Sequence, residues 1–109
     1  MIPYLSLLDL NNSFNPELTE AVLKTVNSGW YLLGSECKSF EAEFSAYCGT
    51  KHCIGVANGL DALVLILKAY KELSVFVDGD EIVVPANTYI ASILAISAAG
   101  LTPVLVEPQ

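Results

Sequence analysis

The chain has 109 residues, of which 53% are hydrophobic and 16% charged, and twelve acidic residues against five lysines give it a formal net charge of −7. This balance argues against a protein that binds a nucleic-acid backbone, which needs a basic face, although backbone amides alone can hold one phosphate. The longest unbroken apolar run, Ala62 to Leu67, is far shorter than the ~20 residues of a membrane span, so we expect no membrane partner.

The surplus of apolar residues predicts that the chain does not cover all of its own hydrophobic surface. A chain of this length buries only about two-thirds of the surface that its unfolded state exposes. With 53% hydrophobic residues, some apolar area stays exposed unless a partner covers it. The chain is therefore either an obligate oligomer or a piece of a larger protein.

The cysteines do not form a metal-binding pattern. Cys37, Cys48 and Cys53 include no CxxC pair and have only His52 beside them, whereas zinc sites use four ligands, commonly in close pairs. We therefore predict no metal site. We interpret the cysteines as buried free thiols of a protein in the reducing cytoplasm.

Two amphipathic helices are predicted in the first half of the chain. Asn15 as N-cap and Pro16 as the first helical residue are typical of a helix start, and Gly29 ends this helix. Ser35 is predicted to cap a second helix that ends at Gly49. The side chains expected to form the buried stripe of the second helix are Cys37, Phe40, Phe44, Tyr47 and Cys48.

The loop between these helices is strongly apolar. Trp30, Tyr31, Leu32 and Leu33 follow one another between two glycines. Such a loop is rarely left on a free surface. We predict that it lies at a dimer interface or at the rim of a substrate site, and the alternative is a loop packed into its own domain.

The second half of the chain predicts an α/β fold. Short β-branched runs predict strands near 53–57, 82–84 and 103–106, and apolar segments predict helices over 61–73 and 88–99. This alternation is typical of a parallel sheet with helices on both faces, which is a three-layer architecture. The first of these helices is apolar almost all round, so we expect it to be covered on most sides.

The loop after the first predicted strand is a candidate phosphate site, because ligands of open α/β sheets bind beyond the carboxyl ends of the strands. The amides of Gly59, Leu60 and Asp61 would be unpaired at a helix start, where the helix dipole favours an anion. The Asp61 carboxylate would then have to point away from the anion. The alternative is that Asn58 or Asp61 only caps the helix. Tyr89, after the next strand, brings a flat ring to the same sheet edge, which suits a planar phosphorylated cofactor.

Six short motifs follow one another along the chain. They are GWYLLG at 29–34, FEAEF at 40–44, YCGTKH at 47–52, GLDAL at 59–63, GDEIVVP at 79–85 and TYIA at 88–91. In these motifs the chain resembles the N-terminal part of the DegT/DnrJ/EryC1/StrS sugar aminotransferases, which use pyridoxal 5′-phosphate (PLP). The resemblance covers nearly all of the chain but only the front portion of a family member.

The resemblance implies the large domain of a fold-type-I PLP transferase. The chain would be one incomplete domain, with an N-terminal helical segment over 1–50 and part of the PLP-binding domain over 51–109. The family also implies a homodimer with active sites at its interface. Its members take an amino group from an amino donor and transfer it to a nucleotide-linked keto-sugar, in bacterial surface-polysaccharide (lipopolysaccharide) or deoxysugar biosynthesis.

By the same resemblance, Gly59, Leu60 and Asp61 would sit at the cofactor phosphate, and Tyr89 would stack on the pyridine ring. Many members have Thr where this chain has Leu60, so a hydroxyl contact from that position is lost while the backbone contact can survive. Trp30 and Tyr31 would belong to the substrate or dimer-interface loop. The segments VANGLD at 56–61 and NTY at 87–89 most resemble the subgroup that acts on dTDP-3-keto-6-deoxyhexoses.

The family's Schiff-base lysine lies further along than any lysine of this chain. We therefore predict no catalytic residue within the chain and no transamination by the chain alone, since this chemistry requires a lysine in the site. A related branch of the family has His at that position and dehydrates its sugar substrate. A PLP-dependent sugar dehydratase and a non-enzymatic α/β module that binds a phosphorylated ligand are the alternatives to the aminotransferase.

Overall fold

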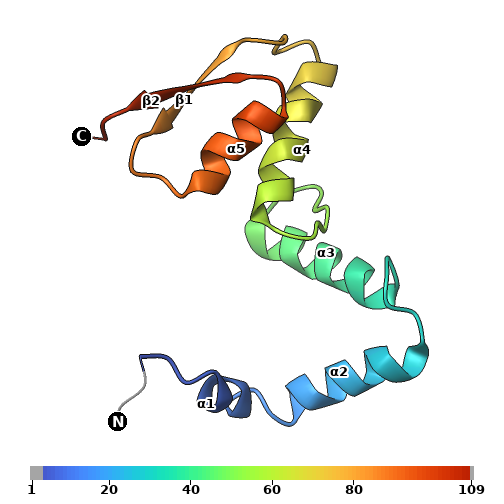
Figure 1. Ribbon diagram of the computed structural model, residues 1–109. Helices are drawn as coiled ribbons and strands as arrows, with labels where there is room; N and C mark the ends of the chain where they lie inside the picture. Colours follow the sequence, from blue (N-terminus) through green and yellow to red (C-terminus); the bar gives the residue numbers. More distant parts are fainter. Residues whose placement is uncertain (1–3, 109) are drawn as a thin grey trace. The chain divides into compact units, whose positions relative to one another are not determined.

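The computed structural model describes residues 4–108 and divides into two compact units, Met1–Gly55 and Val56–Gln109 (Figure 1). The first unit contains the helices α1 (Leu7–Asn12), α2 (Glu17–Ser28) and α3 (Ser35–Cys48). The second contains α4 (Gly59–Glu72), β1 (Glu81–Pro85), α5 (Ile90–Ala98) and β2 (Thr102–Val106). Over residues 4–108, no helix combines the length and the apolar character needed to cross a membrane.

Helices α2 and α3 end where the sequence predicts. Gly29 and Gly49 each adopt a φ of +67°, the left-handed conformation that glycine accepts without steric cost. Their amides donate hydrogen bonds back to carbonyl oxygens of the last helical turn. Both predicted helix ends are therefore confirmed.

The starts of the same helices lie one residue away from the predicted positions. Pro16 rather than Asn15 occupies the N-cap of α2, and the Asn15 side chain accepts a hydrogen bond from the Thr19 hydroxyl at 2.7 Å. Gly34 rather than Ser35 is the N-cap of α3, so Ser35 is its first residue. In neither helix does the N-cap side chain bond to the first turn.

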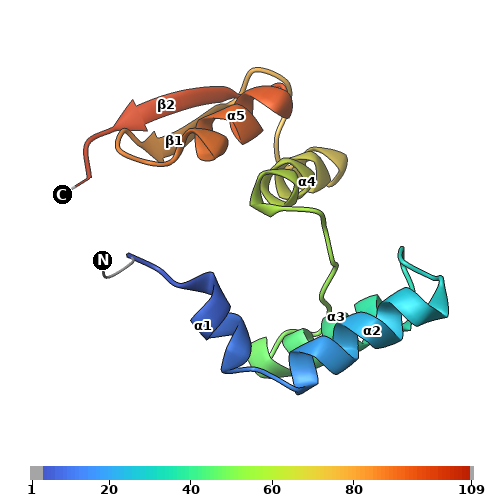
Figure 2. The same cartoon turned by 60° about the horizontal axis from the view of Figure 1, so that its bottom comes forward.

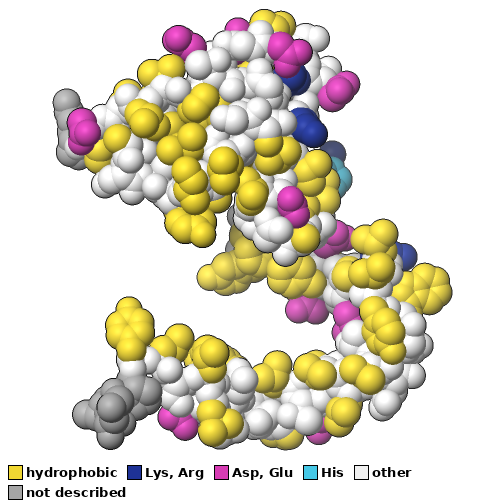
Figure 3. Space-filling model, in the orientation of Figure 1, with side chains coloured by type: hydrophobic (Ala, Val, Ile, Leu, Met, Phe, Trp, Pro, Cys, Tyr) yellow, Lys and Arg dark blue, Asp and Glu magenta, His cyan; other side chains and the backbone are white. Residues whose placement is uncertain are grey.

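The stripe that was expected to be buried on α3 is exposed in this chain. Phe40 and Phe44 contact each other with ring centroids 5.5 Å apart, yet about half of each side chain meets solvent, and Tyr47 is 87% exposed. Cys37 and Cys48 are exposed as well. The element pairs in closest contact all belong to the second unit, so no layer of the described residues covers this face. Hydrophobic side chains accordingly show on the surface of both units in Figure 3.

The second unit has the predicted α/β character. Strands β1 and β2 pair in parallel, with Glu81 opposite Thr102 and Pro85 opposite Val106. Helix α5 connects them and packs against both strands and against α4 (Figures 1 and 2). It begins at Ile90, two residues after the predicted start, because Tyr89 has an extended backbone and serves as its N-cap.

The strand predicted near 53–57 is not formed, which corrects the expected three-strand sheet to two strands. A strand needs a neighbouring ladder, and the Gly55 amide is instead used in a hydrogen bond to Glu41 Oε1 of α3, at 2.7 Å. Residues 53–57 therefore form neither a helix nor a strand.

The core of the second unit is small. Val84 of β1, Ile96 of α5 and the adjoining Ala99 and Leu101 are each at most 6% exposed. Helix α4 contributes one partly buried side chain, Leu67, to this core, and none of its residues is fully buried. The expectation that this helix is covered on most sides is thus not met by the described residues alone.

Hydrogen bonds continue past both ends of the strand pair. At one end, the Gly79 amide donates to the Gly100 carbonyl at 2.9 Å. At the other end, the Ala86 amide donates to the Val106 carbonyl at 2.8 Å. The chain is therefore held where it enters and leaves the sheet.

Candidate functional site

A pocket of about 750 Å³ lies between the start of α4 and the start of α5. It is lined by Asn58, Gly59, Leu60, Leu63, Tyr89, Ile90, Ala91, Ser92 and Leu94. Three of the four residues predicted to bind a cofactor, Gly59, Leu60 and Tyr89, thus lie on one pocket. The fourth, Asp61, is absent from its lining.

Asn58 caps α4 and forms two hydrogen bonds with Asp61. Its Oδ1 accepts from the Asp61 amide at 2.9 Å, and its Nδ2 donates to Asp61 Oδ2 at 3.0 Å. The Asp61 amide is therefore already used within the helix start. The prediction of three unpaired amides is corrected to two. Asn58 caps the helix, as the alternative had it, and it lines the pocket as well.

The amides of Gly59 and Leu60 are the two that remain. Within residues 4–108, neither donates a hydrogen bond to the protein. A Cβ placed on Gly59 would meet no atom within 4 Å, so the protein itself leaves room at this position. Two free amides at the positive end of a 14-residue helix are suited to an anion.

Tyr89 lines the other side of the pocket. Tyr89 is 80% exposed, so its ring is free to stack on a planar ligand. The backbone beside it is fixed, because the Ser92 amide donates to the Tyr89 carbonyl at 3.0 Å and the hydroxyls of Thr88 and Ser92 lie 3.0 Å apart.

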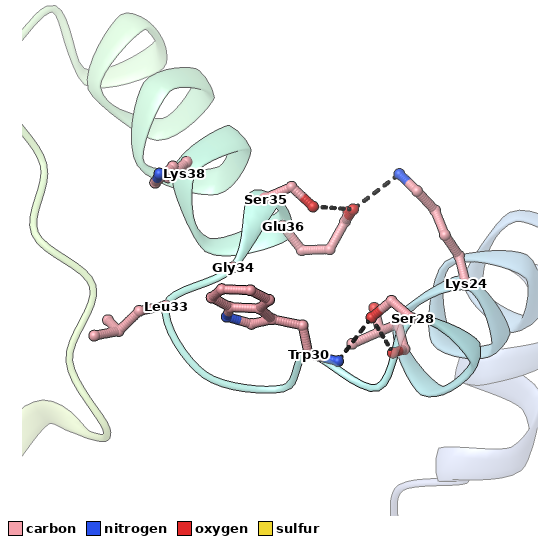
Figure 4. Close-up of a pocket in the computed structure, with 9 residues that line it drawn as sticks. Lys24, Ser28, Trp30, Leu33, Gly34, Ser35, Glu36 and Lys38 are labelled. Carbon is pink, nitrogen blue, oxygen red and sulfur yellow. Dashed lines mark hydrogen bonds and ion pairs between the residues drawn. The ribbon is translucent and has the colours of Figure 1, made fainter.

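A separate pocket of about 470 Å³ lies in the first unit beside the apolar loop (Figure 4). Trp30 forms one wall, where its indole lies against Gly34 (Figure 4), and a Cβ on that glycine would come within 3.1 Å of the ring. At the rim, Lys24 Nζ lies 2.8 Å from Glu36 Oε1. The hydrogen bond from Lys24, and then its charge, lower the pKa of the Glu36 carboxyl.

The apolar loop is exposed but internally bonded. Trp30 Nε1 donates to the Leu32 carbonyl at 2.7 Å, and the Tyr31 hydroxyl donates to the Val26 carbonyl at 3.2 Å. Leu33 has a φ of +52°, a conformation that costs free energy for a branched side chain. About 69% of Trp30 meets solvent in this chain. The loop is therefore an internally bonded apolar surface, and residues 4–55 do not cover it.

Two features of these sites were not predicted. The ion pair of Lys24 and Glu36 joins two helices across the loop, and no periodicity in the sequence indicates it. The reciprocal bonding of Asn58 and Asp61 has a local signal, since an N-cap residue followed three positions later by a polar partner is typical of a capping box. Among the described residues, no three His, Cys, Asp or Glu side chains are grouped so that they could hold a metal ion.

The curated relatives of the chain include sugar transaminases. The chain is 57% identical over 109 residues to dTDP-3-amino-3,6-dideoxy-α-D-galactopyranose transaminase of Aneurinibacillus thermoaerophilus. The aligned region is 100% of this chain and 29% of that protein. It is 48% identical over 108 residues to dTDP-3-amino-3,4,6-trideoxy-α-D-glucose transaminase of Streptomyces venezuelae, in an alignment that includes 99% of this chain and 27% of that relative. The chain thus spans less than a third of the length of these relatives.

The fold agrees with these relatives. The crystal structure of S. venezuelae DesV in complex with a ketimine intermediate superposes with a TM-score of 0.86 at 47% identity, over 99% of this chain and 28% of DesV. The family model of the DegT/DnrJ/EryC1/StrS aminotransferases matches residues 12–109. The resemblance carried by the six motifs is confirmed, and the chain belongs to the DegT/DnrJ/EryC1/StrS aminotransferase family.

Proposed function

We propose that this chain is the N-terminal part of a PLP-dependent aminotransferase that transfers an amino group to a dTDP-linked keto-6-deoxysugar. The observation that carries the proposal is the pocket in which two unpaired amides, those of Gly59 and Leu60, lie across from the exposed ring of Tyr89. The dTDP-sugar transaminases to which the chain is similar support the class of substrate. The family's homodimer and a location in the cytoplasm are part of the proposal.

The residues of the pocket fit a phosphorylated pyridine. The phosphate requires donors and space close to the backbone, and the Gly59 and Leu60 amides supply both because Gly59 carries no side chain. A flat ring requires an aromatic face, which Tyr89 presents. The volume, about 750 Å³, lies within the range of small-molecule sites.

Each residue then has a separate task. The Gly59 and Leu60 amides would hold the phosphate at the start of α4, and Leu60 would contribute no hydroxyl. Tyr89 orients the ring and keeps water from one of its faces. Bound PLP supplies an electron sink through which an amino group passes from a donor to a keto-sugar.

The lysine that would bind the cofactor covalently is proposed to lie outside this chain. None of the lysines that the structure describes lines the pocket of Gly59 and Tyr89. Lys24 and Lys71 are engaged in ion pairs with Glu36 and Asp78, respectively. We accordingly propose that the chain alone does not transfer amino groups.

Trp30 and Tyr31 are proposed to lie against a second copy of the protein or at the rim of the substrate site. This position is supported by the exposure of their internally bonded apolar loop, which is unfavourable in water. Fluorescence quenching of Trp30 by iodide tests this, because the whole assembled protein should protect the indole and a dissociated subunit should not. Equal quenching in both would exclude contact with a second copy and leave the rim of the substrate site.

The function itself is tested on the whole protein that carries this chain. Reduction with borohydride in the presence of PLP should label one lysine beyond residue 109. Incubation with an amino acid and a dTDP-3-keto-6-deoxyhexose should give a sugar with a new primary amine, identified by mass spectrometry. A sugar that loses a hydroxyl and gains no nitrogen would establish the dehydratase instead, and absence of PLP binding would leave the phosphate-binding module.

A further inference from the structure

The Asp61 carboxylate poses an electrostatic problem for the site, and this inference rests on the function proposed above. An acidic residue in the first turn stabilises a helix through its dipole, but it repels an anion bound at the same end. Within residues 4–108, no Lys or Arg lines the pocket of Gly59 and Tyr89, so no cation of this part of the protein offsets the charge there. Binding of a phosphate then depends on where the carboxylate points.

Asp61 lies on a different hollow from the two free amides. Asp61 lines a different hollow, of about 300 Å³, together with Val56, Ala57, Val64 and Leu65. Asn58, Gly59 and Leu60 line the pocket that holds the free amides. The bond from Asn58 Nδ2 to Asp61 Oδ2, at 3.0 Å, fixes this orientation.

Asn58 performs both parts of this arrangement with one side chain. Its Oδ1 accepts the Asp61 amide at 2.9 Å, which withdraws that amide from competition for a ligand. Its Nδ2 neutralises part of the carboxylate charge by a charge-assisted hydrogen bond. Both bonds are needed, since an acceptor alone would cap the helix and leave the carboxylate free to turn.

We propose that Asn58 is a positioning residue of the cofactor site, which favours phosphorylated ligands by holding the Asp61 carboxylate away from the two free amides. Its effect falls on the phosphate and not on the ring. The affinity for a ligand without phosphate should therefore not depend on the bond between Asn58 and Asp61. This expectation separates the proposed role from a purely structural one.

The test measures binding of pyridoxamine 5′-phosphate and of pyridoxamine to the whole apoprotein by equilibrium dialysis. Neither probe forms an imine with a lysine, so the ratio of their dissociation constants reports on the phosphate alone. In Asn58→Asp the cap is kept, because Asp is as good an N-cap as Asn, but the donor is replaced by a second carboxylate. We expect pyridoxamine 5′-phosphate to bind at least tenfold more weakly and pyridoxamine to stay within twofold.

The matched control exchanges the two side chains. In Asn58→Asp combined with Asp61→Asn, the bonded pair is rebuilt in the opposite sense and the net charge is restored, but the carboxylate now stands at position 58, which lines the pocket of the free amides. Pyridoxamine 5′-phosphate should therefore still bind at least tenfold more weakly than to the parent. Recovery of the parent's affinity in this double variant, or equal weakening of both probes by Asn58→Asp, would overturn the proposal.

A second pair of variants covers the case in which Asn58→Asp fails to fold. Asn58→Gly removes both bonds at little cost to the helix start and should weaken only the phosphorylated probe. Adding Asp61→Asn to Asn58→Gly should restore binding of pyridoxamine 5′-phosphate. If the ratio of the two dissociation constants in Asn58→Gly equals that of the parent, the inference is contradicted. A parent protein that binds neither probe overturns the proposed function, and that outcome is distinct from a parent that binds both while its variants behave alike.

Discussion

Lys71 Nζ donates a hydrogen bond to the carbonyl oxygen of Ala99, 2.9 Å away and 28 residues along the chain. The same amine forms an ion pair with Asp78. One side chain near the end of α4 therefore holds the end of α5 and the turn that leads into β1. Ala99 is only 3% exposed, so its carbonyl has little access to water as an alternative partner.

Replacing Lys71 by Met should lower the free energy of unfolding by about 1.5 kcal/mol, because a charge-assisted hydrogen bond to a buried carbonyl is lost while the aliphatic stem is kept. Asp78→Asn should cost less than about 0.5 kcal/mol, since that side chain is 80% exposed and its ion pair is screened by water. Urea unfolding of both variants measures the difference. Equal costs would show that the ion pair, not the bond to Ala99, carries the stabilisation.

Gly100→Ala should destabilise the protein more than Gly29→Ala does. Both glycines have a positive φ, so each substitution strains the backbone by roughly 1 kcal/mol. At Gly29 the new Cβ meets open space, whereas at Gly100 it would lie 2.6 Å from Asp78 Oδ1 and displace that carboxylate from Lys71. In an Asp78→Ala background the excess cost of Gly100→Ala should disappear, as a double-mutant cycle on unfolding free energies can measure.

The pKa of Glu36 should rise toward its ordinary value of 4.5 in Lys24→Gln. Lys24 lowers this pKa, first by its hydrogen bond and then by its charge. The pair therefore favours the folded state above pH 4.5, and this contribution is lost as the pH falls through the lowered pKa. NMR titration of the Glu36 carboxyl carbon measures the change.

Lys38→Gln is the control for that titration. Lys38 lines the same pocket but forms no ion pair among residues 4–108, so its removal should leave the Glu36 midpoint close to that of the parent. High salt should raise the parent's midpoint, because the pair is exposed to screening ions. A Lys24→Gln titration that matches the parent would refute the assignment.

Gly59→Val should impair cofactor binding without unfolding the protein. The position has open space around its Cα and α4 begins there, so the fold itself does not require glycine. A valine side chain would occupy the approach to the Gly59 and Leu60 amides. Pyridoxamine 5′-phosphate should bind at least tenfold more weakly, while the melting temperature stays within a few degrees of the parent's. Unchanged binding would show that the phosphate does not bind at this loop.

Tyr89 should act on the ring of the cofactor rather than on its phosphate. Tyr89→Phe keeps the aromatic face and should bind as the parent does. Tyr89→Ala should weaken pyridoxamine and its phosphate by the same factor, roughly five- to tenfold, in line with aromatic contacts of about 1 kcal/mol. A loss confined to the phosphorylated probe would contradict stacking.

The parts of the fold that the sequence predicts best are those with local causes. The ends of α2 and α3 follow from Gly29 and Gly49, whose backbone conformation is a property of the residue itself. The pairing of β1 and β2 follows from two short apolar runs joined by a helix. Neither depends on anything outside the described residues.

The failures concern features that depend on a neighbour. A strand at 53–57 requires a partner ladder, and the Gly55 amide is bonded to Glu41 instead. The apolar face of α3 was expected to be buried, but burial is decided by the layer that covers a helix and not by its periodicity. At the pocket, residue types indicated Gly59 and Tyr89, whereas the reciprocal bonds that engage Asp61 became visible only from side-chain positions.

The bond between the Ala86 amide and the Val106 carbonyl affects how Tyr89 can meet a ligand. Only two residues, Asn87 and Thr88, separate this anchored position from Tyr89, and the Thr88 amide is itself bonded to the Pro85 carbonyl at 3.2 Å. The backbone that carries the ring has therefore given up most of its conformational entropy on folding. When a planar ligand arrives, the side-chain torsions of Tyr89 are what remain to be ordered, so stacking is not offset by the immobilisation of a loop.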